Sequence, residues 1–240
     1  MPRNVIILTT GLAGSSVLTG LLAEAGYWTG DDTFKKSDYN TFENQELVEL
    51  NRGIFKAVGY ERNYTMEFSR NDVRMIAERS HDIDPAPYRD FVSRCEQHHP
   101  WIWKDPRLSL TIRFWKDMLD LSNVQFIILS REEFQTWVST TIRRQIQTRD
   151  YCRRYMNEVH SSLMEFLGEN KLPHIEIIYE DILMRPEATL KTLNDYLGTS
   201  LDMSNLTRVY RGPLHRKQRG FVDTIKAYLI YLKNFHLRYR

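Results

Sequence analysis

Cysteine is scarce in this sequence, with two residues, Cys95 and Cys152, in a chain of 240. Two thiols cannot form a disulfide framework or a four-cysteine zinc site. The seven histidines are scattered, and no pair stands at ligand spacing near a cysteine. No metal site is therefore predicted, and the cysteine usage fits a reducing compartment.

Long apolar runs are also missing. No run approaches the roughly 18 residues that a membrane-spanning helix needs. The apolar run at residues 5–8 is shorter than the roughly 7–15-residue core of a signal peptide. We therefore expect a cytoplasmic protein with no membrane span. The length and the 42% hydrophobic content are typical of a globular protein, predicted here as a single domain over residues 1–240.

Net charge is small, at +2, but it is unevenly distributed. Residues 208–240 hold nine basic residues and one acid, hence +8, so the rest of the chain carries −6. A basic tail suggests an anionic partner, such as nucleic acid, a lipid head group or a phosphorylated ligand; the alternative is a solvated helix face. Aromatic residues in the tail would stack bases, but their spacing of three to seven fits a helix packed on the core. No nucleic-acid partner is predicted.

Short apolar runs alternate with long helical patterns. Near-continuous apolar runs predict strands buried on both faces, as in a parallel sheet. Strands are expected at residues 5–9, 101–103, 124–130 and 174–179. Helices are expected at 15–25, 44–58, 84–99, 108–121, 132–168 (in two pieces), 186–197 and 221–235. This alternation predicts an α/β, three-layer domain with a central, mostly parallel sheet flanked by helices.

A loop of small residues, TTGLAGSS, follows the first predicted strand. Gly11, Ala13 and Gly14 let the backbone approach a ligand closely, and the helix that follows offers unpaired N–H groups at its N-terminus. Ser15 and Ser16 add hydroxyl donors and are expected to cap the helix. The loop is therefore a candidate anion site; the alternative is a tight turn that binds nothing. Its place at the carboxyl end of a strand favours the ligand.

This loop lacks the cation of a nucleotide-triphosphate loop, GxxxxGK[ST]. Ser15, not lysine, follows Gly14, and the loop contains no arginine. An ordinary ATPase or kinase is therefore disfavoured.

A second candidate anion site follows the clearest strand. Arg131 stands at its carboxyl end, placed to fork onto a phosphate, and Ser139 lies eight residues later. Two helical turns separate them, so Ser139 reaches the same phosphate only if the strand-end loop folds back. The alternative is an ordinary surface arginine and a helix-surface serine.

Four stretches together resemble the sulfotransferases that use 3′-phosphoadenosine 5′-phosphosulfate (PAPS). They stand in the family's order and spacing over residues 4–198: TTGLAGSS, WKDPRL, ILSREEFQTWVS and IIYEDILMRPEATLKTLNDYLG. The resemblance implies a P-loop-like fold. It also implies PAPS as co-substrate, without a metal, and transfer of a sulfonate group to a hydroxyl or amine.

The resemblance also implies roles for particular residues. Arg131 and Ser139 would hold the 3′-phosphate, and Lys104 would lie near the transferring group. A basic C-terminal loop closes over the 3′-phosphate in the family; here the segment with Arg216 and Arg219 matches it in composition only. The 5′-phosphosulfate would lie against Gly11, Leu12, Ala13, Gly14, Ser15 and Ser16.

Two departures from the family pattern stand out. Leu12 occupies the position where the family's loop carries lysine or arginine, and Pro106 replaces a histidine that some members use as base. Lys104 is our candidate replacement cation, with Arg107 as a second possibility. The alternative for Lys104 is a surface lysine paired with Asp105.

Glu43 is the preferred candidate for the base that takes the acceptor's proton, because related sequences have an acid in this stretch. The alternative is a carboxylate at a helix N-terminus, favoured by the dipole. His98 and His99 are other candidate bases. An apolar acceptor wall, or simply core, would come from Tyr27, Trp28, Phe34, Tyr39 and Phe42.

The predicted function is sulfonate transfer from PAPS to an unidentified small-molecule or glycan acceptor. Two alternatives stay open. One is a non-catalytic interaction module with a sulfotransferase-like fold, which Leu12 favours because the loop lacks its cation. The other belongs to a different enzyme class, a small P-loop kinase-like transferase.

Overall fold

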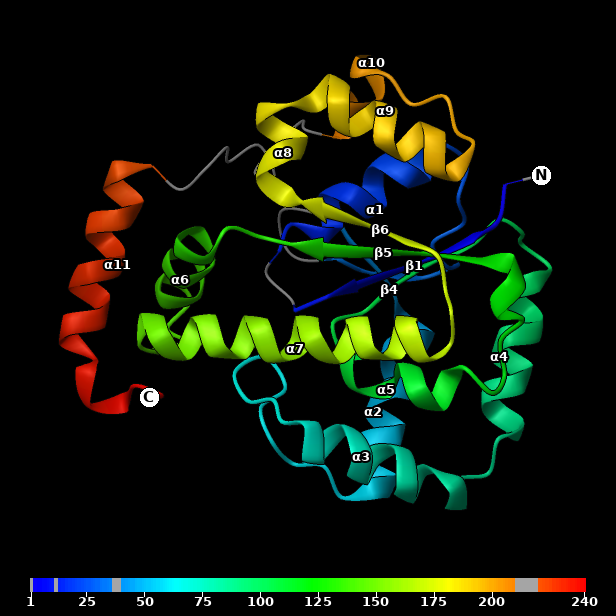
Figure 1. Cartoon of the computed structure of the whole chain (residues 1–240), viewed down its shortest axis with the longest axis horizontal. Coiled ribbons are helices and arrows are strands. Elements are labelled where there is room, and N and C mark those ends of the chain that lie inside the picture. The colour runs from blue at the N-terminus through cyan, green and yellow to red at the C-terminus, as the bar shows by residue number, and fades with distance from the viewer. Residues whose placement is uncertain (1, 11–12, 36–39, 210–219) are drawn as a thin grey trace.

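The computed structural model describes residues 2–10, 13–35, 40–209 and 220–240 (Figure 1). Its centre is a sheet of four parallel strands in the order β4-β1-β5-β6. The strands are β1 (Asn4–Thr9), β4 (Ile102–Lys104), β5 (Val124–Ser130) and β6 (His174–Ile178). The predicted α/β class with a parallel sheet is confirmed.

Burial on both faces holds for three of these strands. β1 and β4 are buried throughout, and β5 is buried except at its last residue. β6 lies at the sheet edge and is half exposed, with Ile178 46% exposed. The expectation is therefore wrong for β6, although the other edge strand, β4, is buried.

Helices cover both faces of the sheet (Figure 1). Alternate residues of β1 point to opposite sides: Val5 and Ile7 pack in one core cluster, Ile6 and Leu8 in the other. The first cluster is covered by α1 (Ser15–Glu24), α8 (Tyr179–Met184), α9 (Pro186–Leu197) and α10 (Met203–Val209). The second is covered by α2 (Gln45–Val58), α3 (Arg70–Arg79), α4 (Ala86–Glu96), α5 (Leu108–Trp115) and α7 (Arg149–Glu169).

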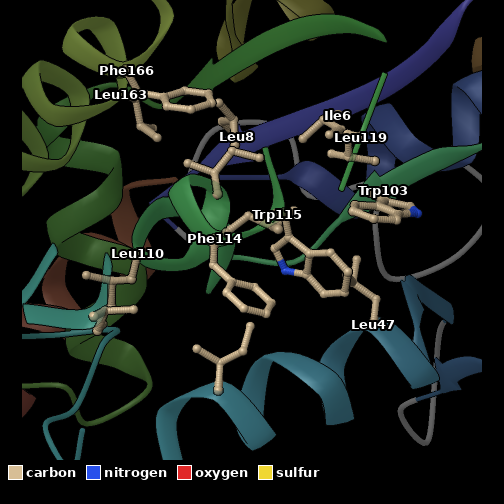
Figure 2. Packing of buried hydrophobic residues seen from close by; sticks show 14 of the residues in the cluster. Ile6, Leu8, Leu47, Trp103, Leu110, Phe114, Trp115, Leu119, Leu163 and Phe166 are labelled. Atoms are coloured by element: carbon tan, nitrogen blue, oxygen red, sulfur yellow. The ribbon is translucent and has the colours of Figure 1, made fainter. Parts of the chain in front are cut away.

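Tryptophans fill the larger cluster. Figure 2 shows Trp103 of β4 and Trp115 of α5 within it. Their ring centroids are 4.9 Å apart, nearly edge to face, and both side chains are fully buried. Aromatic pairs of this geometry add to the free energy of burial. This packing fixes the segment between the two residues, which includes Lys104, against the sheet.

Two helices lie at one end of the sheet, α6 (Glu133–Ile142) and α11 (Phe221–Lys233). Ala227 of α11 is buried in a small cluster with Trp137 of α6, and Tyr231 packs against that cluster. No helix in the described part of the chain is long and apolar enough to cross a membrane.

Most predicted elements are present. The pattern at 132–168 divides into α6 and α7 as expected, whereas the helix predicted over 108–121 ends at Trp115. The sequence did not predict α3, α8, α10 or an antiparallel hairpin of β2 (Thr33–Lys35) and β3 (Asn40–Asn44). Short 3₁₀ helices occur at Ser80–Asp82, Leu121–Asn123 and Phe235–Leu237.

Candidate active site

The small-residue loop lies between the end of β1 and the start of α1. Gly14 is the N-cap of α1, with φ of 76°, and its carbonyl accepts a hydrogen bond from Val17 N at 2.9 Å. Among the described side chains none caps this helix, and its first turn has no acid. Ser15 and Ser16 therefore do not cap the helix, contrary to expectation. The arrangement suits an anion at the helix N-terminus; Gly11 and Leu12 lie outside the described residues.

Gly14 is required here by a close neighbour as well as by its backbone. A Cβ at this position would lie 2.0 Å from Cδ2 of Tyr179, the first residue of α8. Real Cβ atoms do not approach a ring carbon so closely, and only glycine adopts this φ without strain. The loop therefore packs directly onto the Tyr179 ring.

Arg131 and Ser139 lie together, although two helical turns separate them in the sequence. Arg131 Nη1 lies 2.9 Å from Ser139 Oγ and donates a hydrogen bond to it. Ser139 is buried and the Arg131 side chain is only 9% exposed, so neither is an ordinary surface residue. Glu180 orients the arginine: its carboxylate accepts from Arg131 Nε at 3.1 Å and from the backbone N–H of Glu132 at 3.0 Å.

Tyr179 joins the two candidate anion sites. The Arg131 guanidinium carbon lies 5.1 Å from the centroid of the Tyr179 ring, which also contacts Gly14. The Tyr179 ring therefore lies between the loop and Arg131 and contacts both. Sequence reasoning missed Tyr179 and Glu180 as site residues, although both belong to the YED of the late motif that carries the family resemblance.

Lys104 and Glu43 form an ion pair beside the loop. Lys104 Nζ lies 2.8 Å from Glu43 Oε1. The Lys104 side chain is fully buried, whereas the Glu43 side chain is 24% exposed. Lys104 ends β4 and stands opposite Ile7 of β1 in the sheet register, so the pair lies towards the carboxyl end of β1. The alternative of a surface lysine paired with Asp105 is wrong.

The backbone around Glu43 has an unusual conformation. The preceding residue, Phe42, has φ of 55°, which is rare for a bulky side chain. Its ring lies against α1 at Gly20, where a Cβ would come within 2.9 Å of Phe42 Cε2. Asn44 is the N-cap of α2, and its side chain accepts from Leu47 N at 3.1 Å. Glu43 therefore directly precedes the N-cap of α2, and the alternative of a carboxylate at the helix N-terminus stays open.

Asp105 turns away from Lys104 into a buried hydrogen-bond network. Its carboxylate accepts from Arg107 Nη1 at 2.8 Å and from Asn51 Nδ2 at 2.8 Å. Burial raises the pKa of Asp105, while the Arg107 charge and the hydrogen bonds from Arg107 and Asn51 act in the opposite direction. Arg107, the second candidate cation, is thus engaged with Asp105 and lies over the Tyr64 ring, 4.6 Å from its centroid.

Tyr155 of α7 supports the loop from the other side of the sheet. Its hydroxyl lies 2.8 Å from the carbonyl oxygen of Tyr64 and 3.3 Å from that of Thr10, where the loop begins. Burial raises the pKa of Tyr155, so the hydroxyl keeps its proton and remains a donor. No sequence pattern indicated this contact.

The remaining candidates divide by position. His98 stacks on Trp28, and His99 Nδ1 lies 2.9 Å from Oδ1 of Asn4, the first residue of β1. Both histidines are therefore at the amino end of the sheet, opposite the loop, and are wrong as candidate bases. Tyr27 belongs to the core. Three other residues, Tyr39, Arg216 and Arg219, lie outside the described part of the chain.

Metal ligands do not cluster in the described residues: no group of three or more His, Cys, Asp and Glu side chains is placed to hold an ion.

Comparison with solved structures identifies the fold. The sulfotransferase domain of the Synechococcus PCC 7002 olefin synthase superposes with a TM-score of 0.54 at 17% identity, over 95% of this chain and 94% of that one. The sulfotransferase domain from the curacin biosynthetic pathway gives 0.52 at 15% identity, over 93% and 82%. Sulfotransferase STF9 from Mycobacterium avium gives 0.51 at 13% identity, over 98% and 76%.

Sequence comparison adds nothing to this, since no protein-family model and no curated protein matches the chain. The structural likeness extends over nearly the whole chain in each case. The chain therefore has the P-loop-like α/β fold of these sulfotransferase domains.

Proposed function

We propose that this protein is a PAPS-dependent sulfotransferase, which transfers a sulfonate group to a hydroxyl or amine of a small-molecule or glycan acceptor. The observation that carries the proposal is the Tyr179 ring, which contacts both Gly14 and Arg131. It sets the two candidate anion sites side by side, an arrangement that would suit the two phosphate-bearing ends of a single nucleotide.

Each element would take one end of the donor. The N–H groups at the start of α1, with the hydroxyls of Ser15 and Ser16, would bind the 5′-phosphosulfate. Arg131 and Ser139 would bind the 3′-phosphate by charge-assisted and neutral hydrogen bonds. Glu180 would hold the guanidinium in place, since it accepts from Nε while Nη1 donates to Ser139 Oγ.

The reaction would be an in-line displacement at sulfur. The acceptor oxygen or nitrogen forms a bond to sulfur while the bond from sulfur to the 5′-phosphate oxygen breaks, and the electron pair stays on that phosphate. Positioning and stabilisation of the charge developing there supply most of the catalysis. Lys104 would stabilise this charge in place of the lysine or arginine that the family's loop carries at the position of Leu12. Glu43 would take the acceptor's proton.

Calorimetric binding of 3′-phosphoadenosine 5′-phosphate tests the donor site. Adenosine 5′-phosphate lacks only the 3′-phosphate, and ADP carries the same number of phosphates in other positions. The proposal expects the 3′-phosphorylated nucleotide to bind about 10–100-fold more tightly than either. Arg131→Ala should remove this preference, whereas Arg74→Ala, an exposed arginine on α3, should leave it unchanged.

The second candidate function, a non-catalytic interaction module, is favoured by Leu12 alone. It predicts that none of the three nucleotides binds. Equal binding of ADP and the 3′-phosphorylated nucleotide would instead favour a kinase-like transferase. Either result would overturn the sulfotransferase proposal.

A further inference from the structure

Exposed apolar side chains gather on α11 and on the short 3₁₀ helix that follows it. Among the described residues, eight of the eleven exposed large hydrophobic side chains lie between residues 221 and 237. Four of them are spaced three and four apart along α11 and so form one stripe, which we call the outer face of α11. Its residues are Val222, Ile225, Leu229 and Leu232, each between 44% and 78% exposed.

The opposite side of α11 is already packed. Ala227 is fully buried, and the rings of Tyr228 and Tyr231 lie 5.0 and 5.6 Å from that of Trp137 on α6. Figure 1 shows α11 at the edge of the molecule, so the side of the helix that does not face α6 is turned away from the sheet. The helix is therefore anchored without the outer face. Contiguous apolar patches of this kind on soluble proteins mark interaction sites.

Positive charge borders the outer face. Lys226 directly follows Ile225, and Lys233 directly follows Leu232. Because the two lysines are seven residues apart, they lie on the same flank of the stripe. The helix has one acid, Asp223, and the chain that continues from it adds Arg238 and Arg240. The surface thus combines an apolar centre with a basic margin.

We propose that the outer face of α11 binds the surface of an anionic lipid bilayer. A bilayer interface matches both parts of this surface. Its acyl chains would contact the apolar stripe, and its negative head groups would attract the lysines. Lysine stems lie along apolar surface while their ammonium groups reach outwards, which fits Lys226 and Lys233 at the margin. Since α11 is far too short to span a membrane, it would lie in the plane of the head groups.

A second copy of the chain fits this surface less well. Two outer faces in contact would bring two basic margins together, and each helix supplies a single acid against two lysines. Like charges brought together oppose association. A flat anionic surface has no such conflict.

Co-sedimentation of the full chain with lipid vesicles tests the proposal. Vesicles of equimolar phosphatidylcholine and phosphatidylserine should bind the protein, and added salt should weaken the binding. Phosphatidylcholine alone should bind it at least about fivefold more weakly. The double variant Leu229→Ser/Leu232→Ser should lower partitioning about tenfold or more, and each of Lys226→Gln and Lys233→Gln about fivefold.

Matched controls separate the outer face from the general surface. Met203→Ser removes an exposed apolar side chain from α10, and Lys56→Gln removes an exposed lysine from α2. Neither should change partitioning. All substituted side chains are exposed, so thermal unfolding should show that every variant folds.

Three results would overturn the proposal. In the first, the folded chain binds no anionic vesicles. In the second, binding persists in the double leucine variant, which would indicate that charge alone causes it. In the third, the leucines prove necessary for a dimer and not for lipid. The last result would assign the outer face to self-association. None of these measurements depends on nucleotide binding, so the proposal stands or falls separately from the sulfotransferase function.

Discussion

Lys104 Nζ lies 2.8 Å from Glu43 Oε1, although the two residues are 61 positions apart in the chain. The cation and the base that we assign to sulfonate transfer are therefore one ion pair. Their exposure differs, since the lysine side chain is fully buried and the glutamate side chain is 24% exposed. An acceptor would reach the pair from the side of Glu43.

Neutralising either partner should lower kcat about 100–1,000-fold. Each substitution removes either the cation that stabilises the transition state or the base that takes the acceptor's proton. The effects on stability should differ. Glu43→Gln removes a charged partner of the buried ammonium and should cost about 3 kcal/mol. Lys104→Met leaves a carboxylate that water already reaches and should cost about 1 kcal/mol. Urea unfolding and turnover measurements on the two variants check both parts.

Glu46→Gln is the matched control, since Glu46 is half exposed and pairs with Arg94 on the surface. It should change neither kcat nor stability appreciably. If Glu43→Gln retained full activity, Glu43 would not be the base. If Lys104→Met were the more costly variant, the assignment of the buried charge would be wrong.

Gly14→Ala should be far more destabilising than the same change at another left-handed glycine. At Gly14 the new Cβ meets the Tyr179 ring at 2.0 Å; at Gly198, with φ of 70°, it meets nothing within 4 Å. The backbone cost of about 1–2 kcal/mol is common to both. Overpacking adds about 1–3 kcal/mol at Gly14 only. Urea unfolding of the two variants measures the difference.

A Tyr179→Ala background tests the cause. There the cost of Gly14→Ala should fall to that of Gly198→Ala. If Gly14→Ala and Gly198→Ala were equally destabilising in the wild-type background, the loop would be able to move away from the Tyr179 ring. The same variants should weaken binding of 3′-phosphoadenosine 5′-phosphate in the order of their destabilisation.

The order of strands and helices could be predicted because the buried strands are continuous apolar runs and the helices have clear stripes. The helix at Pro186–Leu197 has its predicted bounds, set by a first-turn proline and a terminal glycine. The hairpin of β2 and β3 could not be predicted: TFK and NTFEN lack alternation, and Phe42 takes a backbone conformation that its side chain disfavours.

The candidate site was partly predictable for a related reason. Arg131 and Ser139 are close in sequence, so helical geometry limits where they meet. Lys104 and Glu43 meet because β3, which the sequence did not predict, packs against β4. Tyr179 was predicted as the last strand residue, but it begins α8, and this turn aims its ring at the loop.

Both thiols should be unreactive in the folded protein. Burial raises the pKa of Cys95 and of Cys152 from 9.0 to about 12. Near pH 8 the thiolate fraction is then about 1,000-fold below that of a free cysteine, and the thiolate is the reactive form. Since these folded-state values lie above 9.0, the thiols' contribution to stability is complete below about pH 9 and is lost as the pH rises towards 12.

Reaction with a disulfide reagent at about pH 8 checks the thiols, with and without denaturant. Native protein should react only as fast as it opens, and unfolded protein at once with both residues. Met203→Cys places a thiol on the exposed surface of α10 and should react at once in the native state. Rapid labelling of either native cysteine would contradict the burial.

Asn51→Asp should destabilise the protein in a pH-dependent way. The amide of Asn51 donates to Asp105 Oδ2 at 2.8 Å, so the substitution removes a donor and sets a second carboxyl group against the first. Burial already raises the pKa of Asp105, and two facing carboxyls share a proton, which raises the folded-state pKa further. The variant's stability should therefore be retained at acid pH and lost as the pH rises through that value.

The deficit relative to wild type should be about 3 kcal/mol near pH 8 and clearly smaller near pH 5. Asn194→Asp is the matched control, because the partners of Asn194 are Thr199 and Leu201 and not a carboxylate. Its deficit should not grow between these two pH values. If Asn51→Asp lost the same stability at pH 5 and at pH 8, Asp105 would not be the group that faces the new carboxyl. Because Asp105 directly follows Lys104, the same variant should lower kcat most where it is least stable.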